Sequence, residues 1–201
     1  MREPVRVVHE LVSGIVPADA LEREHQNDAL AWLETTDDVF RRIKPATPDP
    51  HLVAYVVLVD PEDGSTLLVE HLLAGLWLPA GGHVEPDEHP ADTADRETRE
   101  ELGIKPEFAD PARRPFFITV SQTVGLPPVH TDVSLWFLLL GRRELMLTPD
   151  QREFTEVRWW TTEQVQADTS GRFDPHYQRF LAKLAKLASS TGQGSPPLRP
   201  A

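Results

Sequence analysis

The chain has 201 residues, of which 40% are hydrophobic and 26% charged, and its formal net charge is −12. This length suits one domain with a full core, and the acidic charge argues against a nucleic-acid polymer as partner, because phosphate backbones require a basic surface. The absence of Cys excludes disulfides and thiolate zinc sites. No apolar run reaches the length of a membrane span and no signal-peptide core is present, so we expect a cytoplasmic protein without a membrane partner.

Residues 1–50 predict a helical N-terminal extension. Apolar residues recur at broadly helical spacing over residues 17–35, and an Asp is placed to cap a second short helix ending near Phe40. Residues 44–50 are rich in Pro, which favours a linker into the next segment. The large apolar side chains of the extension are expected to pack on the domain or on a second subunit, which leaves a homodimer open.

Residues 51–71 predict a β-hairpin. Residues 51–59 are rich in β-branched residues and indicate a buried strand. An Asp-Gly turn signal follows in residues 60–65, and residues 66–71 supply the return strand.

A glycine turn and a helix come next. Gly81 and Gly82 predict a turn at which the backbone comes close to a ligand, with amides and carbonyls facing a metal or a phosphate. Residues 89–102 then predict a helix, because Pro90 suits its first position and Gly103 suits the left-handed position after its end.

This helix carries an unfavourable row of acids. Glu97, Glu100 and Glu101 are three and four residues apart beside the predicted core face, where like charges each destabilise a helix by about 0.2–0.5 kcal/mol. A cation between them would relieve the repulsion, and hard oxygen ligands favour Mg²⁺, with Mn²⁺ as a second choice. From the helix alone, a solvated acidic face remains the alternative.

The rest of the chain predicts more strands and helices. Strands are expected at residues 115–124 and 132–140, and a short strand from about Glu156 follows an acidic loop. Helices are expected after Thr161 or Thr162 and over residues 175–188. Together these elements indicate a layered α/β or α+β domain, and we expect the polar residues 189–201 to form a disordered tail.

The glycine-to-helix stretch resembles the signature of the Nudix hydrolase family. Gly82 is followed after five residues by Glu88, and after seven more by residues 96–104, RETREELGI. Every charged and glycine position of the Nudix box is filled. Thr98 departs from the usual aliphatic residue, and its hydroxyl is expected to bond back to a carbonyl one turn earlier.

The resemblance implies a fold and a metal site. It implies an α/β/α sandwich with a mixed β-sheet over residues 51–188. It also implies that Glu97, Glu100 and Glu101, helped by the carbonyl of Gly81, hold Mg²⁺.

Further roles follow from the same resemblance. Arg96 and Glu88 would hold the metal-binding glutamates in place. A further ligand or general base would come from the later acidic loop, with Glu153 preferred to Glu156 and a solvated loop charge as the alternative.

The implied substrate is a nucleoside diphosphate linked to another group. A (deoxy)nucleoside triphosphate, oxidised purine forms included, is the first choice, and ADP-ribose or another nucleotide sugar is the second. Gly82 is a candidate for binding phosphate, Trp77 or Trp136 for stacking on a base, and Asp132 for contacting substrate unless it belongs to a capped turn. A Nudix-fold binding domain without catalysis is the remaining alternative, although such domains usually lack some box carboxylates.

Overall fold

The computed structural model describes residues 2–44, 46–123 and 129–191. Its centre is a seven-stranded mixed sheet with the main order β3-β2-β1-β6-β5, while β4 pairs with β1 and β7 pairs with β2. The strands are β1 His51–Val59, β2 Thr66–His71, β3 Leu76–Leu78, β4 Ala80–His83, β5 Phe117–Gln122, β6 Thr131–Leu140 and β7 Phe154–Trp160. The helices are α1 Glu3–Ser13, α2 Ala20–Thr35, α3 Pro90–Leu102, α4 Thr162–Ala167 and α5 Tyr177–Thr191.

Strand β1 is buried on both faces of the sheet. It runs parallel to β6 over its whole length and antiparallel to β4. Its even-numbered side chains from Leu52 to Leu58 enter one apolar cluster, whereas Val57 and Val59 enter another on the opposite face. The sequence of β1 after His51 is accordingly a continuous apolar run, as expected of a strand covered on both sides.

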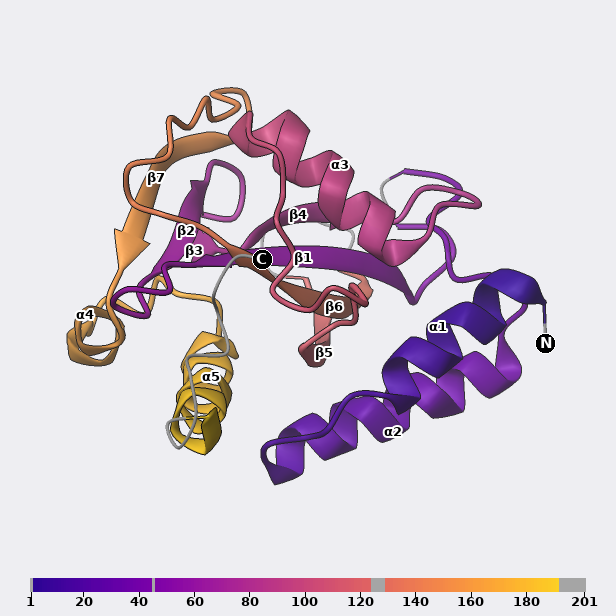
Figure 1. The fold of residues 1–201 in the computed structure, drawn as a ribbon. Helices are drawn as coiled ribbons and strands as arrows, with labels where there is room; N and C mark the ends of the chain where they lie inside the picture. The colour runs from indigo at the N-terminus through magenta and orange to yellow at the C-terminus, as the bar shows by residue number, and fades with distance from the viewer. Residues whose placement is uncertain (1, 45, 124–128, 192–201) are drawn as a thin grey trace.

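Helices cover both faces and produce the expected sandwich. Helix α3 lies over one face and α5 over the other, as Figure 1 shows. Leu102 of α3 enters the first cluster and Phe180 of α5 the second, and both side chains are fully buried. Burial of such side chains contributes roughly 1.5–3 kcal/mol each, so the two helices are held mainly by apolar packing.

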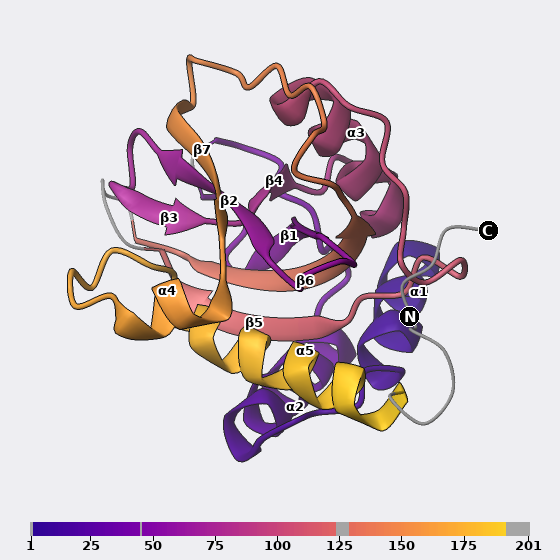
Figure 2. The ribbon, with the colours of Figure 1, turned by 60° about the vertical axis from the view of Figure 1, so that its left-hand side comes forward.

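The N-terminal helices are part of the packed structure. Helices α1 and α2 lie side by side, and α2 passes β5, the edge strand of the main sheet order (Figure 2). Arg179 of α5 donates two hydrogen bonds to the Asp19 carboxylate at 3.0 and 2.7 Å, at the N-cap of α2. An ion pair therefore joins α2 to α5, two helices that lie far apart in the sequence.

Most elements agree with the sequence predictions, and two do not. The second short helix near Phe40 is absent: Thr36 and Asp38 bond to nearby backbone groups instead and form a turn. The predicted glycine turn is also wrong, because Gly81 and Gly82 belong to β4 and pair with β1.

The end of the chain lies partly outside the described residues. Helix α5 continues to Thr191, past the predicted start of the tail, and residues 192–201 are not described. None of the described helices is long and apolar enough to cross a membrane.

Candidate active site

The box helix forms one wall of a cavity of about 360 Å³. Strand β4 and the segment before β7 contribute other parts of the lining. Of the residues singled out from the sequence, those in the lining are Gly81, Gly82, Arg96, Glu97, Glu100, Glu101, Asp132 and Glu153. Segments far apart in the chain thus bring most of the predicted site to one place.

The ends of α3 are set by local sequence signals. Pro90 occupies the first turn, and the His89 side chain accepts a hydrogen bond from the Ala91 N–H. Gly103 ends the helix with a φ of 71°, in the left-handed region that glycine tolerates. The Thr98 hydroxyl donates to the Ala94 carbonyl at 2.7 Å, so the expected back-bond is confirmed.

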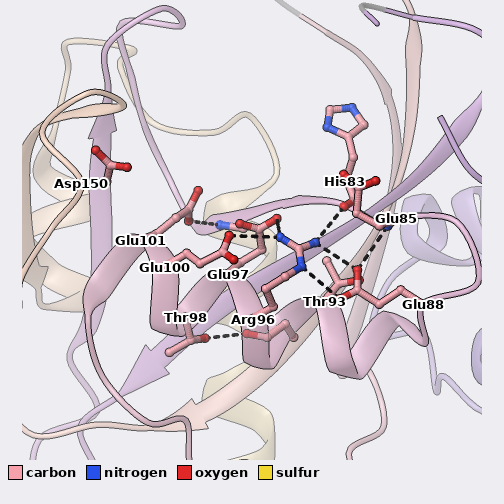
Figure 3. A network of polar contacts seen from close by, with 12 residues as sticks. His83, Glu85, Glu88, Thr93, Arg96, Glu97, Thr98, Glu100, Glu101 and Asp150 are labelled. Atoms are coloured by element: carbon pink, nitrogen blue, oxygen red, sulfur yellow. Dashed lines mark hydrogen bonds and ion pairs between the residues drawn. The ribbon is translucent and has the colours of Figure 1, made fainter. Parts of the chain in front are cut away.

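Arg96 is the centre of a charge network along the helix (Figure 3). Its Nε and Nη2 donate to the two carboxylate oxygens of Glu88, each at 3.0 Å. Its Nη1 donates to Glu97 at 2.8 Å and to Glu100 at 3.3 Å. Because Glu88 also accepts from the Thr93 hydroxyl and the Glu85 N–H, the guanidinium is held from behind while it aligns two box glutamates.

Glu101 lacks such a cation, although its side chain is buried. Its Oε2 accepts a hydrogen bond of 2.7 Å from the Gly81 N–H. Burial, together with the neighbouring Glu97 and Glu153, raises the pKa of Glu101 to about 9, and the Gly81 bond only partly opposes the shift. Burial also raises the pKa of Glu97, against the influence of Arg96.

This donor set fits a divalent cation. Glu101 and the largely buried Glu97 both have raised pKa values, although Glu97 pairs with Arg96. A cation held between the two carboxylates would stabilise their ionised forms. Gly82 leaves the space that Glu97 occupies, since a Cβ at residue 82 would lie 2.4 Å from Glu97 Oε1.

Gly81 is required for a different reason. Its φ is 133°, and a Cβ there would lie 2.2 Å from the carbonyl oxygen of Ala54 in β1. Only glycine permits this approach, which places the Gly81 amide beside Glu101. The two glycines therefore act through close packing within the sheet and against α3.

A second cavity of about 420 Å³ adjoins the first. Both are lined by Arg41, Tyr55, His71, Leu78, His83 and Asp132. The second also reaches Ser121 to Thr123 on β5 and beyond it, and Asp174 and Pro175 ahead of α5. The two cavities together form a longer pocket, and the box glutamates line the first cavity only.

The structure does not bring the predicted stacking residues to this space. Trp77 packs against Trp160 with ring centroids 5.0 Å apart, and Trp136 is fully buried among aromatic rings. Both belong to the second apolar cluster, so the stacking role expected of Trp77 or Trp136 is not supported. A Trp in a sequence shows only that a large apolar side chain is present, and such a side chain is more often buried in the core than exposed to a ligand.

Two other candidates lie outside the cavity lining. Glu88 contacts Arg96 from behind, as described above. Glu156 is exposed on β7, opposite Glu70 of β2.

Several lining residues were missed from the sequence. Arg41 and Lys44 come from the segment between α2 and β1. Lys44 begins the predicted linker, and Arg41 directly follows the short helix predicted to end near Phe40. Tyr55 lies in the middle of β1 and gave no signal beyond β propensity. The available signal in the sequence was the presence of Arg41 and Lys44 just before the predicted domain, since basic side chains in an acidic protein suggest an anionic ligand.

The family model of the NUDIX domain matches residues 49–184 of the chain. This chain belongs to the Nudix family. The match includes β1, the box helix and β7, so every element that lines the two cavities except the segment before residue 49 falls within the Nudix domain. Members of the family are hydrolases that typically use a divalent metal ion, which agrees with the donor set on α3.

Solved structures of Nudix proteins share the fold. The MutT protein from Methanosarcina mazei Go1 is 20% identical, with a TM-score of 0.53 over 67% of this chain and 92% of that one. A MutT Nudix hydrolase from Burkholderia pseudomallei is 20% identical, with a TM-score of 0.51 over 66% and 96% of the two chains. A Nudix hydrolase from Clostridium perfringens is 19% identical, with a TM-score of 0.50 over 68% and 94%.

At these identities the likeness concerns the fold alone. The search among curated proteins found no match.

Proposed function

We propose that this Nudix protein hydrolyses a pyrophosphate bond of a nucleoside triphosphate, oxidised purine forms included, with the help of Mg²⁺. The observation that carries the proposal is the placement of Glu97, Glu100 and Glu101 along one wall of a cavity that Arg41 and Lys44 also line. Carboxylates suit a hard cation, and the basic side chains suit the polyphosphate that such a cation accompanies.

The dimensions of the site support a nucleotide. Ligand sites for small molecules usually measure about 300–1,000 Å³, and each of the adjoining cavities falls in that range. In our proposal the phosphates lie between α3 and the basic side chains, and the nucleoside extends into the second cavity. Tyr55, which lines both cavities, takes the place of the buried tryptophans as the aromatic ring beside the nucleoside.

In this reaction water adds across a P–O–P bridge, so that one P–O bond forms and another breaks. Mg²⁺, when bound, would neutralise phosphate charge and acidify the attacking water. Glu97, Glu100 and Glu101 would hold the ion, with the carbonyl of Gly81 as a further ligand. Arg96 would keep Glu97 and Glu100 aligned, and Glu88 would keep Arg96 in place.

A proton must leave the water as it attacks phosphorus. Glu153 is exposed, lines the cavity and lies close enough to Glu101 to influence its pKa. We assign it the role of general base, because it combines access to solvent with proximity to the box. Gly82 would contact the substrate from β4.

A panel of substrates tests the proposal. Nucleoside and deoxynucleoside triphosphates, 8-oxo-dGTP, ADP-ribose and nucleotide sugars are each incubated with the protein, with and without Mg²⁺, and phosphate, pyrophosphate and nucleotide products are measured. We expect Mg²⁺-dependent cleavage of a triphosphate, and its loss in Glu101→Gln. Faster cleavage of ADP-ribose or a nucleotide sugar would replace the triphosphate by the second substrate class. Nucleotide binding without any product would instead indicate a binding domain.

A further inference from the structure

A second group of metal-ligating side chains contains none of the box glutamates. It consists of His51 at the start of β1, His83 at the end of β4, and His130 and Asp132 around the start of β6. One ligand atom from each lies within 4.8 Å of the others, and among the described residues no further group of His, Asp or Glu side chains is gathered so closely. We call these four residues the histidine cluster.

The distances within the histidine cluster resemble the edges of a coordination tetrahedron. The Nε2 atoms of His51 and His83 are 3.1 Å apart. Asp132 Oδ1 lies 3.3, 3.4 and 3.9 Å from the Nε2 atoms of His51, His130 and His83, respectively. For metal–ligand bonds of 2.0–2.2 Å, a tetrahedral zinc site places neighbouring ligand atoms about 3.4 Å apart.

The hydrogen bonds around His51 leave its Nε2 without a proton when the ring is neutral. His51 Nδ1 lies 2.7 Å from the carbonyl oxygen of Pro48, which can only accept, so Nδ1 carries the proton. The Nε2 lone pair then faces a carboxylate oxygen at 3.3 Å, and two acceptors at that distance repel unless a cation lies between them. A backbone carbonyl behind a histidine is also the usual outer partner of a metal ligand.

Asp132 gives an independent indication of a missing cation. Asp132 is nine-tenths buried. Three imidazoles surround its Oδ1, yet this oxygen makes no hydrogen bond within the described part of the chain. An unsatisfied buried carboxylate oxygen is costly. It is expected where the oxygen binds an ion instead.

The sheet holds the four ligands in place. His51 and Asp132 are direct partners in the parallel pairing of β1 with β6, and His83 pairs with Val53 in the same region of β1. The backbone N–H and the side chain of His130 both lie beside the Thr123 hydroxyl. Figure 3 shows the His83 ring pointing away from Arg96 and the box glutamates, so this ring is not directed at the box metal site although His83 and Asp132 line the same cavity.

We propose that the histidine cluster binds one Zn²⁺ ion in a closed, structural site. Three imidazoles and one carboxylate suit a borderline transition-metal ion, whereas the all-oxygen box suits Mg²⁺. Four protein ligands fill a tetrahedral shell and leave no position for water. The ion would tie together the ends of β1, β4 and β6 beside the cavity.

The test measures metal uptake by the full chain after dialysis against a chelator. Zn²⁺ is titrated in competition with a chromogenic chelator, and Co²⁺ serves as a probe because tetrahedral cobalt absorbs strongly in the visible. The variants are His83→Ala and Asp132→Asn, the matched control is His9→Ala on α1, and a box variant combines Glu97→Gln, Glu100→Gln and Glu101→Gln. None of these readouts requires hydrolysis, so the result is independent of the proposed function.

We expect one tight equivalent of Zn²⁺ and tetrahedral Co²⁺ bands in wild type, in His9→Ala and in the box variant. In His83→Ala and Asp132→Asn the affinity should fall by at least about a hundredfold. Free Zn²⁺ at a hundred times its Kd should raise the Tm of wild type by roughly 5–10 °C. Circular dichroism checks that each variant is folded.

Three results would overturn the zinc site. The first is no zinc uptake by wild type, which would indicate a cluster that shares a proton instead. The second is persistence of the tetrahedral bands in folded His83→Ala or Asp132→Asn. The third is their disappearance in the box variant. Wild type and the box variant decide the matter even if a cluster variant fails to fold.

Discussion

Two buried glutamates show how differently this chain treats negative charge. Glu22 on α2 is fully buried, and its Oε1 accepts a hydrogen bond from Lys183 Nζ at 2.5 Å while its Oε2 accepts from the Ala18 N–H at 2.7 Å. Glu101 on α3 is 5% exposed, and its Oε2 accepts a hydrogen bond from the backbone amide of Gly81. The charged groups that raise its pKa are the carboxylates of Glu97 and Glu153.

The difference in their partners indicates that Glu22 has a structural role and Glu101 a functional one. A buried charge that is fully paired holds two elements in register, here α2 and α5. A buried carboxylate without a cation raises the free energy of the metal-free fold, and it is retained where it binds something. Mutations should therefore affect activity at Glu101 and stability at Glu22.

The largest effect is expected from Glu101→Gln. Loss of one metal ligand should lower kcat/KM by about a thousandfold, because metal ions contribute several kcal/mol to such reactions and each 1.36 kcal/mol is tenfold. The amide can still accept the Gly81 N–H, so the Tm should not fall. Activity is measured on the best substrate of the panel. Asp95→Asn, at an exposed ion pair of the same helix, is the control and should retain wild-type activity; equal turnover in the two variants would contradict the assignment.

Next is Glu22→Gln, which leaves the Lys183 ammonium buried without its partner. We expect a loss of about 3 kcal/mol in the free energy of unfolding, measured by urea denaturation, with normal activity per folded molecule. The double variant Glu22→Gln/Lys183→Met should recover part of the loss, because the uncompensated charge is gone. If Glu22→Gln abolished activity without changing stability, the distinction between the two glutamates would fail.

A smaller effect is expected from Gly82→Ala, whose methyl group would displace the Glu97 carboxylate. The obstacle is the far end of a side chain, so the fold should tolerate the change while activity falls about a hundredfold through misplacement of one ligand. Gly81→Ala is the comparison: its Cβ meets backbone at an unfavourable φ, and we expect about 3 kcal/mol of destabilisation. Thermal melts and kinetics should therefore show mainly a loss of activity in Gly82→Ala and mainly a loss of stability in Gly81→Ala.

A further effect is expected on the pH dependence of stability in the absence of metal. Below pH 4.5, the ordinary pKa of the group, Glu101 is protonated in both folded and unfolded chains and has no effect. Between that value and the folded pKa of about 9, only the unfolded chain releases the proton, so rising pH favours unfolding. Wild type should therefore lose Tm relative to Glu101→Gln as the pH rises from 5 to 9.

Mg²⁺ should reverse that trend, because the ionised carboxylate then holds the ion. The measurement is a series of thermal melts of both proteins with chelator and with saturating Mg²⁺. If Tm varied with pH in the same way for wild type and Glu101→Gln under chelation, the Glu101 carboxyl would not contribute to the pH dependence of stability.

The box helix was determined by the sequence alone. Pro90, Gly103 and the buried face through Ala94 and Leu102 are local signals, and they act within a few residues of one another. The spacing from Gly82 through the box glutamates likewise identified the family and the expected metal site. Local patterns are readable because helix ends and helix faces depend on neighbours in the chain.

The surroundings of the box glutamates were decided only by the tertiary structure. The sequence predicted that Trp77 or Trp136 stacks on a base, but both side chains pack in the core. Tyr55 lines both cavities instead. The histidine cluster draws ligands from residues 51, 83, 130 and 132, which no motif spacing connects. Such sites depend on which strands pair and in which register, and those pairings join residues that are distant in the chain.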